Sequence, residues 1–172
     1  MRIISGKHKG KRLTAPKNLP VRPTTDMAKE SLFNILNNHF YFDSIAVLDL
    51  FAGTGNISFE FASRGSEEIY SIDQHFACVK YINTISKELD LGINTFKSDV
   101  YKFLEKTPLK TDVIFADPPY GRFDLEPLSE SILEHLNKKG KFILECEKGQ
   151  EPFLDADLTD YGDTRILTWT KS

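Results

Sequence analysis

The sequence predicts an α/β fold with a mostly parallel, doubly wound β-sheet. After residue 45, short apolar segments alternate with segments of helical periodicity, which is typical of a parallel sheet with helices on both faces. The apolar segments are nearly continuous, as expected for strands that are buried on both faces. Predicted strands end close to Gly53, Asp73, Asp99 and Asp117. Because ligands bind at the carboxyl ends of parallel strands, these four positions predict one binding site at that edge.

The first 24 residues predict a small β-hairpin followed by a linker. Residues 2–5 and 11–14 have strand character and flank the glycine-bounded turn 6–10. Three prolines mark the linker that follows. We expect residues 1–24 to form a basic appendage with few core side chains, and residues 25–172 to form the main domain.

The remaining elements follow in order. A helix is predicted to begin at Thr25 or Asp26, since either side chain can cap it. Its apolar positions share one helical face and are Ala28, Leu32, Ile35, Leu36 and Phe40. The strands predicted after it are 46–50, 68–73, 93–97, 111–116 and 139–147. The helices predicted between them are about 55–64, 75–89, 99–106 and 125–136. The tail, residues 161–169, is predicted to form a last strand that pairs antiparallel with its neighbours.

Size and composition narrow the class of protein. A chain of 172 residues is expected to form one domain with a small appendage. Cys78 and Cys146 have no His or Cys partner at zinc-like spacing, so we expect two buried thiols in a reducing compartment and no metal. The sequence shows no signal peptide and no apolar run of membrane-spanning length. We therefore expect a cytoplasmic monomer that meets no membrane.

Charge is distributed unevenly along the chain. Residues 1–25 carry seven Lys and Arg residues and no acid, whereas the other 147 residues hold 15 basic and 25 acidic residues. A basic arm on an acidic body suggests that the arm meets an anionic partner, with nucleic acid as the natural candidate. The alternative is a merely solvated charged segment. The residues expected to contact RNA are Lys7, Lys9, Lys11, Arg12, Arg22 and Thr24.

A glycine loop, Phe51-Ala52-Gly53-Thr54-Gly55, follows the first predicted strand. Gly53 and Gly55 are expected to let a ligand approach the backbone between strand and helix. A dinucleotide-binding motif has a third glycine three residues after Gly55, but Ser58 occupies that position. The loop therefore favours a ligand without a pyrophosphate. S-adenosylmethionine is such a ligand. We expect Phe51 to contact it and Asp49 to face its cationic sulfonium and amine.

Two further acids are predicted to bind the same cofactor. Asp73 ends the second strand, 20 residues after Gly53, the spacing at which an acid reaches ribose hydroxyls in this architecture. Asp99 either accepts a hydrogen bond from the adenine amine or caps the helix that begins at Val100. The two roles of Asp99 are compatible.

The most informative segment is Asp117-Pro118-Pro119-Tyr120, which follows the strand 111–116. An exocyclic amine of a nucleobase is a poor nucleophile because its lone pair is delocalised into the ring. Two acceptors, the Asp117 carboxylate and the Pro118 carbonyl, can localise that lone pair on nitrogen by accepting hydrogen bonds from the two N–H groups. The prolines make the corner rigid, and Tyr120 offers a flat surface on which a base stacks. All four residues, Pro119 included, are therefore predicted to form the catalytic corner. Asp117 is also expected to contact the cofactor.

These motifs resemble those of Rossmann-like S-adenosylmethionine-dependent methyltransferases, and the whole chain is similar to the RsmD family of bacterial 16S rRNA guanine-N2 methyltransferases. The segments that carry the closer resemblance are Arg2–Gly6, Gly10–Leu13, Arg22–Asp26, Leu32–Leu36, Leu48–Gly55, Ser63–Gly65 and Asp117–Tyr120, with Glu30, Glu60, Asn83 and Asp99. The chain departs from the family at Lys29, where Arg is usual, and at Asp73, where Glu is usual.

The resemblance implies methylation of one guanine, of the guanine(966)-N2 type, in 16S rRNA within a small-subunit ribosomal particle. The residues alone imply only methyl transfer to an exocyclic amine, which leaves adenine N6, cytosine N4 and a protein glutamine amide open. A non-catalytic RNA-binding assembly factor with the same fold is the alternative from another class.

Overall fold

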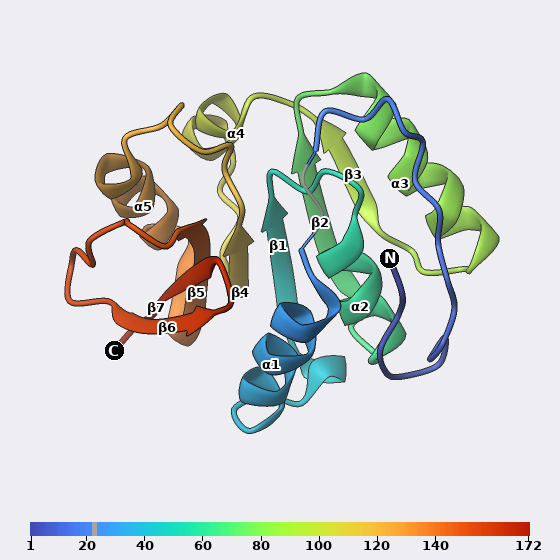
Figure 1. Ribbon diagram of the computed structural model, residues 1–172, viewed down its shortest axis with the longest axis horizontal. Coiled ribbons are helices and arrows are strands. Elements are labelled where there is room, and N and C mark those ends of the chain that lie inside the picture. Colours follow the sequence, from blue (N-terminus) through green and yellow to red (C-terminus); the bar gives the residue numbers. More distant parts are fainter. Residues whose placement is uncertain (22–23) are drawn as a thin grey trace.

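The computed structural model describes residues 1–21 and 24–172 and contains one seven-stranded sheet within them (Figure 1). The strand order is β3-β2-β1-β4-β5-β7-β6. Strands β1 to β5 run parallel, and β7 runs antiparallel to both of its neighbours. The strands span Ala46–Leu50 (β1), Glu68–Asp73 (β2), Asn94–Lys97 (β3), Thr111–Ala116 (β4), Leu136–Glu147 (β5), Asp157–Tyr161 (β6) and Thr164–Thr170 (β7). The predicted doubly wound sheet with an antiparallel C-terminal strand is confirmed.

Helices cover both faces of the sheet, because successive residues of each strand point to opposite sides. Val47 and Val113 belong to the core that holds residues of α1, α2 and α3, whereas Leu48 and Ile114 belong to the core beneath α4 and α5. The helices span Asp26–Asn37 (α1), Asn56–Ser63 (α2), Phe76–Glu88 (α3), Val100–Lys106 (α4) and Leu125–Leu133 (α5), with a 3₁₀ turn at Phe42–Ser44. Among the described residues, no helix has the length and apolarity needed to span a membrane. Cys78 and Cys146 are buried free thiols, as predicted.

Two predicted boundaries near the C-terminal half are wrong. The helix predicted at 125–136 ends at Leu133, and β5 begins at Leu136 instead of residue 139. Leu136 pairs with Thr111 before the register shifts, and Lys139 adopts a φ of +65° at this irregularity. The tail contains a hairpin, β6 and β7, that turns at Gly162 (φ +58°). The sequence pattern predicted a single strand at residues 161–169, which include this turn.

The buried face of α1 also differs from the prediction. Ile35 is 41% exposed, whereas Lys29 and Phe33 are fully buried. Thr25 caps the helix by accepting a hydrogen bond from the Ala28 N–H. The pattern of apolar residues does not predict that Lys29 is buried, because a lysine ammonium is buried only where nearby groups pair with it.

Glu60 of α2 is the centre of that buried polar cluster. Its side chain is fully buried and accepts hydrogen bonds from the Ile4 N–H (2.9 Å), the Ser5 N–H (3.1 Å) and the Arg64 Nε (2.8 Å). The Lys29 ammonium lies 3.2 Å from Glu60 Oε1. Burial lowers the pKa of Lys29, and Glu60 opposes that shift. Glu60 therefore joins the N-terminal hairpin, α1 and α2 at one point.

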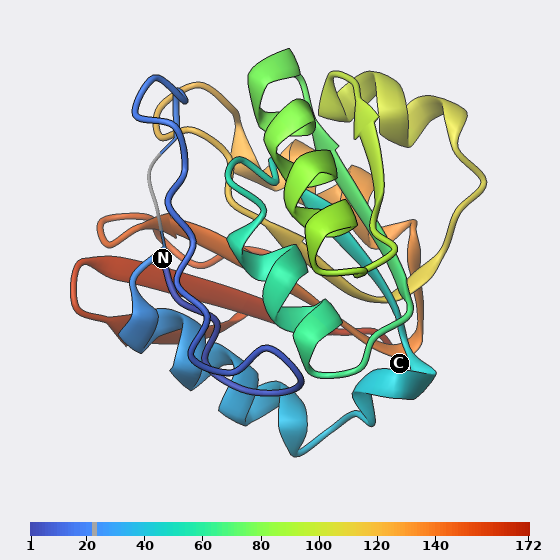
Figure 2. The same cartoon turned by 90° about the vertical axis from the view of Figure 1, so that its right-hand side faces the viewer.

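The N-terminal hairpin runs beside α1 and α2 (Figure 2), and two of its side chains belong to the hydrophobic core. The hairpin is formed by an Arg2–Arg12 bridge and backbone hydrogen bonds such as Ile3 N–H to the Lys11 carbonyl. Ile3 is 1% exposed and Leu13 is 6% exposed. The expectation that residues 1–20 contribute few core side chains is therefore wrong. The boundary predicted at residue 24 stays a prediction.

The hairpin tip packs on the C-terminal end of α2. The Lys7 N–H donates to the Ser63 carbonyl, and the His8 N–H donates to Ser63 Oγ at 3.0 Å. Gly6 has a φ of +89°, and a Cβ there would collide with the Ser63 carbonyl group. Only glycine allows this close approach.

We predict that Glu60→Gln lowers the free energy of unfolding by about 3–5 kcal/mol, because it removes one partner of a buried ion pair. Denaturant unfolding of the full chain measures this change. The matched control is Glu67→Gln, an exposed site, which should change stability by no more than about 0.5 kcal/mol. A loss below about 1 kcal/mol at Glu60 would contradict its central role.

Candidate functional site

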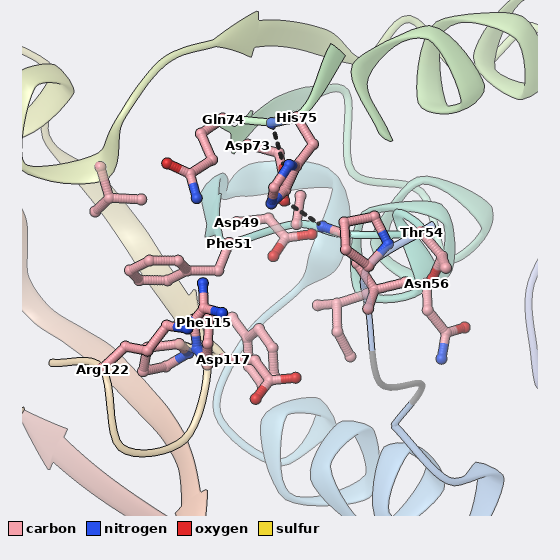
Figure 3. Close-up of a pocket in the computed structure, with 18 of the residues that line it drawn as sticks. Asp49, Phe51, Thr54, Asn56, Asp73, Gln74, His75, Phe115, Asp117 and Arg122 are labelled. Atoms are coloured by element: carbon pink, nitrogen blue, oxygen red, sulfur yellow. Dashed lines mark hydrogen bonds between the residues drawn. The ribbon is translucent and has the colours of Figure 1, made fainter. Parts of the chain in front are cut away.

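A cavity of about 470 Å³ opens at the carboxyl ends of the parallel strands (Figure 3). The sequence-predicted residues that line it are Asp49, Phe51, Gly53, Asp73, Asp99, Asp117, Pro118, Pro119, Tyr120 and Thr24. The strand register produces this convergence: Leu50 pairs with Ile72 of β2 and with Ala116 of β4. The residues that follow these strands therefore meet at one edge.

Asp73 fixes the glycine loop to the end of β2. Its Oδ2 accepts the Gly53 N–H at 2.9 Å, and its Oδ1 accepts the His75 N–H at 2.9 Å, as the dashed lines in Figure 3 mark. A carboxylate has about four acceptor positions, so these two bonds leave capacity for ligand hydroxyls. Phe51 and Gly53 both have φ values of +57°. For Phe51 this backbone conformation is strained and points to a functional constraint on the loop.

Gly55 lies where α2 begins, close to α3. It is not among the cavity-lining residues. A Cβ at Gly55 would lie 2.8 Å from Ile82 Cγ1 and 2.9 Å from Phe59 Cζ. The lack of a side chain at Gly55 therefore lets α2 pack closely against α3, and a contact of Gly55 with the cofactor stays a prediction. Gly53 does line the cavity, where a Cβ would lie 3.1 Å from Val21 Cγ1.

Asp49 is a nearly fully buried acid in the cavity wall, with 1% of its surface exposed. Burial raises the pKa of Asp49 to about 7, while the Ser58 hydrogen bonds oppose the rise and the charge of Asp73 adds to it. The Ser58 hydroxyl donates to Asp49 Oδ2 at 2.6 Å. Ser58 thus replaces the third glycine of a dinucleotide motif with a hydrogen-bond donor, a role that the sequence did not indicate.

Asp99 caps α4 and also lines the cavity, and its contact with adenine stays a prediction. Its Oδ1 accepts the Lys102 N–H at 3.1 Å, which forms the cap. Nearby, Phe123 forms an aromatic wall with Phe51 and Tyr101, at ring-centroid distances of 5.2 Å and 6.0 Å. Phe123 lies outside the Asp117–Tyr120 motif, and the sequence did not indicate a role for it.

The Asp117–Tyr120 corner follows β4, and Figure 3 shows Asp117 and Asp73 on opposite sides of Asp49 and Phe51. Tyr120 is 38% exposed, so its ring is accessible. Its hydroxyl donates to the Cys146 carbonyl at 3.3 Å, which orients the ring. Arg122, two residues further on, also lines the cavity. The corner therefore places an acid and an aromatic ring next to the same space as Asp49.

Sequence reasoning missed the residue that connects this cavity to the Glu60 cluster. Asn56 lines the cavity at the N-terminus of α2, and its Oδ1 accepts a hydrogen bond from Lys29 Nζ at 2.8 Å. Its Nδ2 donates to the Thr24 carbonyl at 3.4 Å. The buried lysine thus supports the chain segment that borders the cavity. Other lining residues that the sequence did not indicate include Val21, Thr54, Gln74 and His75.

The basic side chains of the hairpin lie at the surface of the protein. Lys7, Lys9, Lys11 and Arg12 are all exposed. The tip, however, contacts the C-terminal end of α2, while Asn56 at its N-terminal end lines the cavity. A helix of 8 residues is about 12 Å long, so the Lys7 backbone lies about one helix length from the edge of the cavity at Asn56. Arg22 lies outside the described residues.

Comparison with known proteins identifies close relatives. Residues 1–165 match the family model described as "Conserved hypothetical protein 95". The chain is 35% identical to YlbH of Bacillus subtilis strain 168, named as a candidate rRNA methyltransferase, over 98% of this chain and 94% of that protein. It is 33% identical to ribosomal RNA small subunit methyltransferase D of Buchnera aphidicola from Acyrthosiphon pisum, over 92% of this chain and 84% of that protein.

Solved structures show the same fold. A hypothetical protein of Thermus thermophilus superposes with a TM-score of 0.87 at 26% identity, covering 98% of each chain. The 16S rRNA N2 G1207 methyltransferase RsmC of Thermus thermophilus, in complex with AdoMet and guanosine, superposes with a TM-score of 0.69 at 20% identity. That alignment covers 90% of this chain and 45% of that chain. At this identity the likeness extends to the fold only.

We predict that Asp49 makes the ligand-free protein less stable as the pH rises. Because the folded state raises the pKa of Asp49 from 3.8 to about 7, its protonated form is favoured by folding, and this contribution is lost as the pH rises towards 7. Relative to Asp49→Asn, the wild type should lose about 2–3 kcal/mol of stability between pH 5 and pH 8.

Denaturant unfolding at the two pH values measures this difference. Asp163→Asn, at the exposed turn between β6 and β7, is the control and should follow the wild type at both. An equal pH dependence in wild type and Asp49→Asn would show that Asp49 does not titrate in this range.

Proposed function

The chain belongs to the RsmD family of rRNA methyltransferases, and from this premise we propose that it methylates the N2 amine of one guanine in small-subunit rRNA. The family identifies it as an S-adenosylmethionine-dependent rRNA methyltransferase. The guanine, its N2 position and a 16S rRNA target within a small-subunit particle are the finer part of the proposal. The observation that carries it is the position of the Asp117–Tyr120 corner beside a cavity lined by three further acids.

The cavity residues fit S-adenosylmethionine. The buried carboxylate of Asp49 suits a cationic group, since a positive neighbour favours its ionised form. Asp73 keeps acceptor capacity for ribose hydroxyls beside the loop that it fixes. The aromatic wall of Phe51 and Phe123 suits a planar adenine. Asp99 lies on the same side and can accept from the adenine amine. We assign Asp49, Phe51, Asp73 and Asp99, with Gly53, to the cofactor.

The chain's own residues then prepare the amine of the target base. When bound, S-adenosylmethionine supplies the electrophilic methyl group. The Asp117 carboxylate and the Pro118 carbonyl accept hydrogen bonds from the two N–H groups of the amine. These hydrogen bonds localise the lone pair of the amine on its nitrogen. Pro119 keeps the corner rigid, so that the amine is held in a reactive orientation. The Tyr120 ring stacks on the base. The methylated amine is acidic and releases its proton to water.

We further propose that the RNA extends from the catalytic corner along the hairpin. Thr24 and Tyr120 border the cavity, Arg12 and Lys11 lie on the hairpin strand, and Lys7 and Lys9 lie at its tip. Phosphate contacts of this kind position RNA without reading its bases. The separation of the tip from the cavity implies that the substrate is a folded RNA longer than the target nucleotide alone. We expect the enzyme to act as a monomer.

The test of the function is methyl transfer from labelled cofactor to purified small-subunit particles and to protein-free 16S rRNA, followed by mapping of the modified nucleoside. N2-methylguanosine at a single position is the expected product. Methylation of adenine N6 would replace the proposed target. Tight RNA binding without any transfer would indicate a non-catalytic assembly factor.

We predict that Asp117→Ala keeps cofactor affinity and lowers turnover by about 100-fold or more, because one preorganised partner of the reacting amine is lost. Tyr120→Ala should weaken RNA binding by about 1–3 kcal/mol through lost stacking, and Tyr120→Phe should be tolerated. Asp73→Ala should instead weaken cofactor binding, by about 1.5–3 kcal/mol. Calorimetric titration and single-turnover rates separate these effects. Near-normal turnover of Asp117→Ala at saturating substrate would refute the mechanism.

We predict that replacing Lys7 and Lys9 by alanine weakens RNA binding and its salt dependence together, since each lost phosphate contact lowers the log–log salt slope by about 0.7–0.9. Binding across a salt series measures the slope, and cofactor affinity should stay unchanged. The control pair, Lys87→Ala and Lys106→Ala, lies on exposed ends of α3 and α4. Equal slopes in both double variants would remove the hairpin tip from the RNA interface.

A further inference from the structure

Two arginines stand opposite each other at the open end of the N-terminal hairpin. Arg2 and Arg12 form an antiparallel bridge. The backbone hydrogen bonds next to this bridge join the flanking residues instead of the arginines, Ile3 to Lys11 and Leu13 to Met1, each at 2.9 Å. In a pair of this kind the two side chains share one face and lie close together, with Cβ atoms about 4.5–5.5 Å apart.

The charges of this arginine pair are only partly balanced. Arg2 Nε lies 3.5 Å from Asp26 Oδ2, and the two side chains are 45% and 44% exposed. Arg12 is exposed and forms no ion pair with any of the described residues. Like charges directly opposite each other destabilise strand pairing, and an exposed ion pair offsets little of that cost. The pair therefore carries an unbalanced positive charge, which a bound anion would neutralise.

The arginine pair lines a cavity of about 350 Å³ between the hairpin and the start of α1, which lie side by side in Figure 2. Thr14, two residues after Arg12, lines the same cavity and is exposed. Each guanidinium presents five N–H donors in a planar fork, and this fork matches the oxygens of a phosphate group. The Thr14 hydroxyl is a further donor. The groups that face this cavity are therefore suited to a phosphate.

This arginine cavity adjoins the cofactor cavity. Thr24 lines both. The Lys29 ammonium donates to the Arg2 carbonyl and to Asn56 Oδ1, and Asn56 lines the cofactor cavity. The open end of the hairpin is therefore held next to the catalytic cavity, whereas its tip contacts the far end of α2. An RNA strand whose target base enters the catalytic cavity would bring a neighbouring phosphate within reach of the arginine pair.

We propose that Arg2 and Arg12 form a binding site for a backbone phosphate of the RNA next to the target nucleotide. The two guanidinium groups and the Thr14 hydroxyl donate to the phosphate oxygens, and Asp26 orients Arg2 through its Nε. Phosphate contacts fix the register of a nucleic acid without reading its bases, so both arginines are positioning residues. This inference rests on the proposed function and deepens it, because it adds a contact beside the catalytic cavity to those at the hairpin tip.

The experiment measures binding and methyl transfer with the RNA that the wild type methylates, either the small-subunit particle or protein-free 16S rRNA. Arg12→Gln should weaken RNA binding by about 10-fold or more, the effect of a lost hydrogen bond between charged groups. It should also lower the log–log salt slope by about 0.7–0.9. Arg12→Lys keeps the charge and the slope but lacks the planar fork, so it should weaken binding by about 2- to 10-fold. The KM for RNA should rise in both variants, while cofactor affinity stays unchanged.

A second variant tests Arg2 by a gain of affinity, which a misfolded protein cannot produce. Asp26→Asn removes a negative charge from the arginine cavity and frees Arg2 for the phosphate, so RNA should bind about 2- to 10-fold more tightly. Adding Arg2→Gln to Asp26→Asn should abolish this gain. Asp157→Asn is the matched control and should leave RNA binding unchanged, since Asp157 is exposed at the start of β6 and does not line the cavity.

The outcomes separate this inference from the proposed function. If the wild type methylates neither RNA, the proposed function fails. If the wild type methylates RNA and Arg12→Gln keeps its affinity and salt slope, the phosphate site alone is refuted. Equal affinities of Arg12→Lys and the wild type would show a charged surface instead of a built site. Unchanged RNA binding in Asp26→Asn would leave Arg2 only a structural role with Asp26 and would overturn its part in the site.

Discussion

The arrangement of this molecule depends on the buried carboxylate of Glu60. A charge removed from water must be compensated by nearby donors, and here the donors come from three separate parts of the chain. The Ile4 and Ser5 N–H groups belong to the hairpin, Lys29 belongs to α1, and Arg64 follows α2. The guanidinium of Arg64 also lies 4.6 Å from the centroid of the Phe33 ring. None of these segments can move without breaking the cluster.

The consequence for function is that the hairpin and the cofactor cavity form one structural unit. Lys29 donates to Asn56, and Asn56 donates to the Thr24 carbonyl at the cavity border. The Thr24 hydroxyl in turn bonds Glu145 beside the catalytic corner. A continuous set of hydrogen bonds thus runs from the hairpin to the proposed base site. Its members are buried or partly buried, where hydrogen bonds specify geometry most strongly.

The sequence predicted the sheet and most of the site because those features have local signals. Continuous apolar strands indicated the parallel sheet, and the residues after Leu50, Asp73 and Ala116 indicated its ligand-binding edge. The role of Lys29 had no such signal, since only tertiary contact with Glu60 makes a lysine a core residue. The spacing of Gly55 did not indicate its part in helix packing, because spacing alone does not show which atoms a side chain there would meet. The hairpin looked polar by composition, although Ile3 and Leu13 complete the core.

The central claim is that the Asp117–Tyr120 corner holds the amine of the target base beside the cofactor cavity. The most direct test is a crystal structure of the protein with a non-reactive cofactor analogue and an RNA fragment that contains the target guanine. The account predicts the analogue between the glycine loop and Asp117, and the guanine amine within hydrogen-bonding distance of the Asp117 carboxylate and the Pro118 carbonyl. It also predicts the purine ring against Tyr120. A guanine whose amine lies away from the Asp117 carboxylate and the Pro118 carbonyl would contradict this claim.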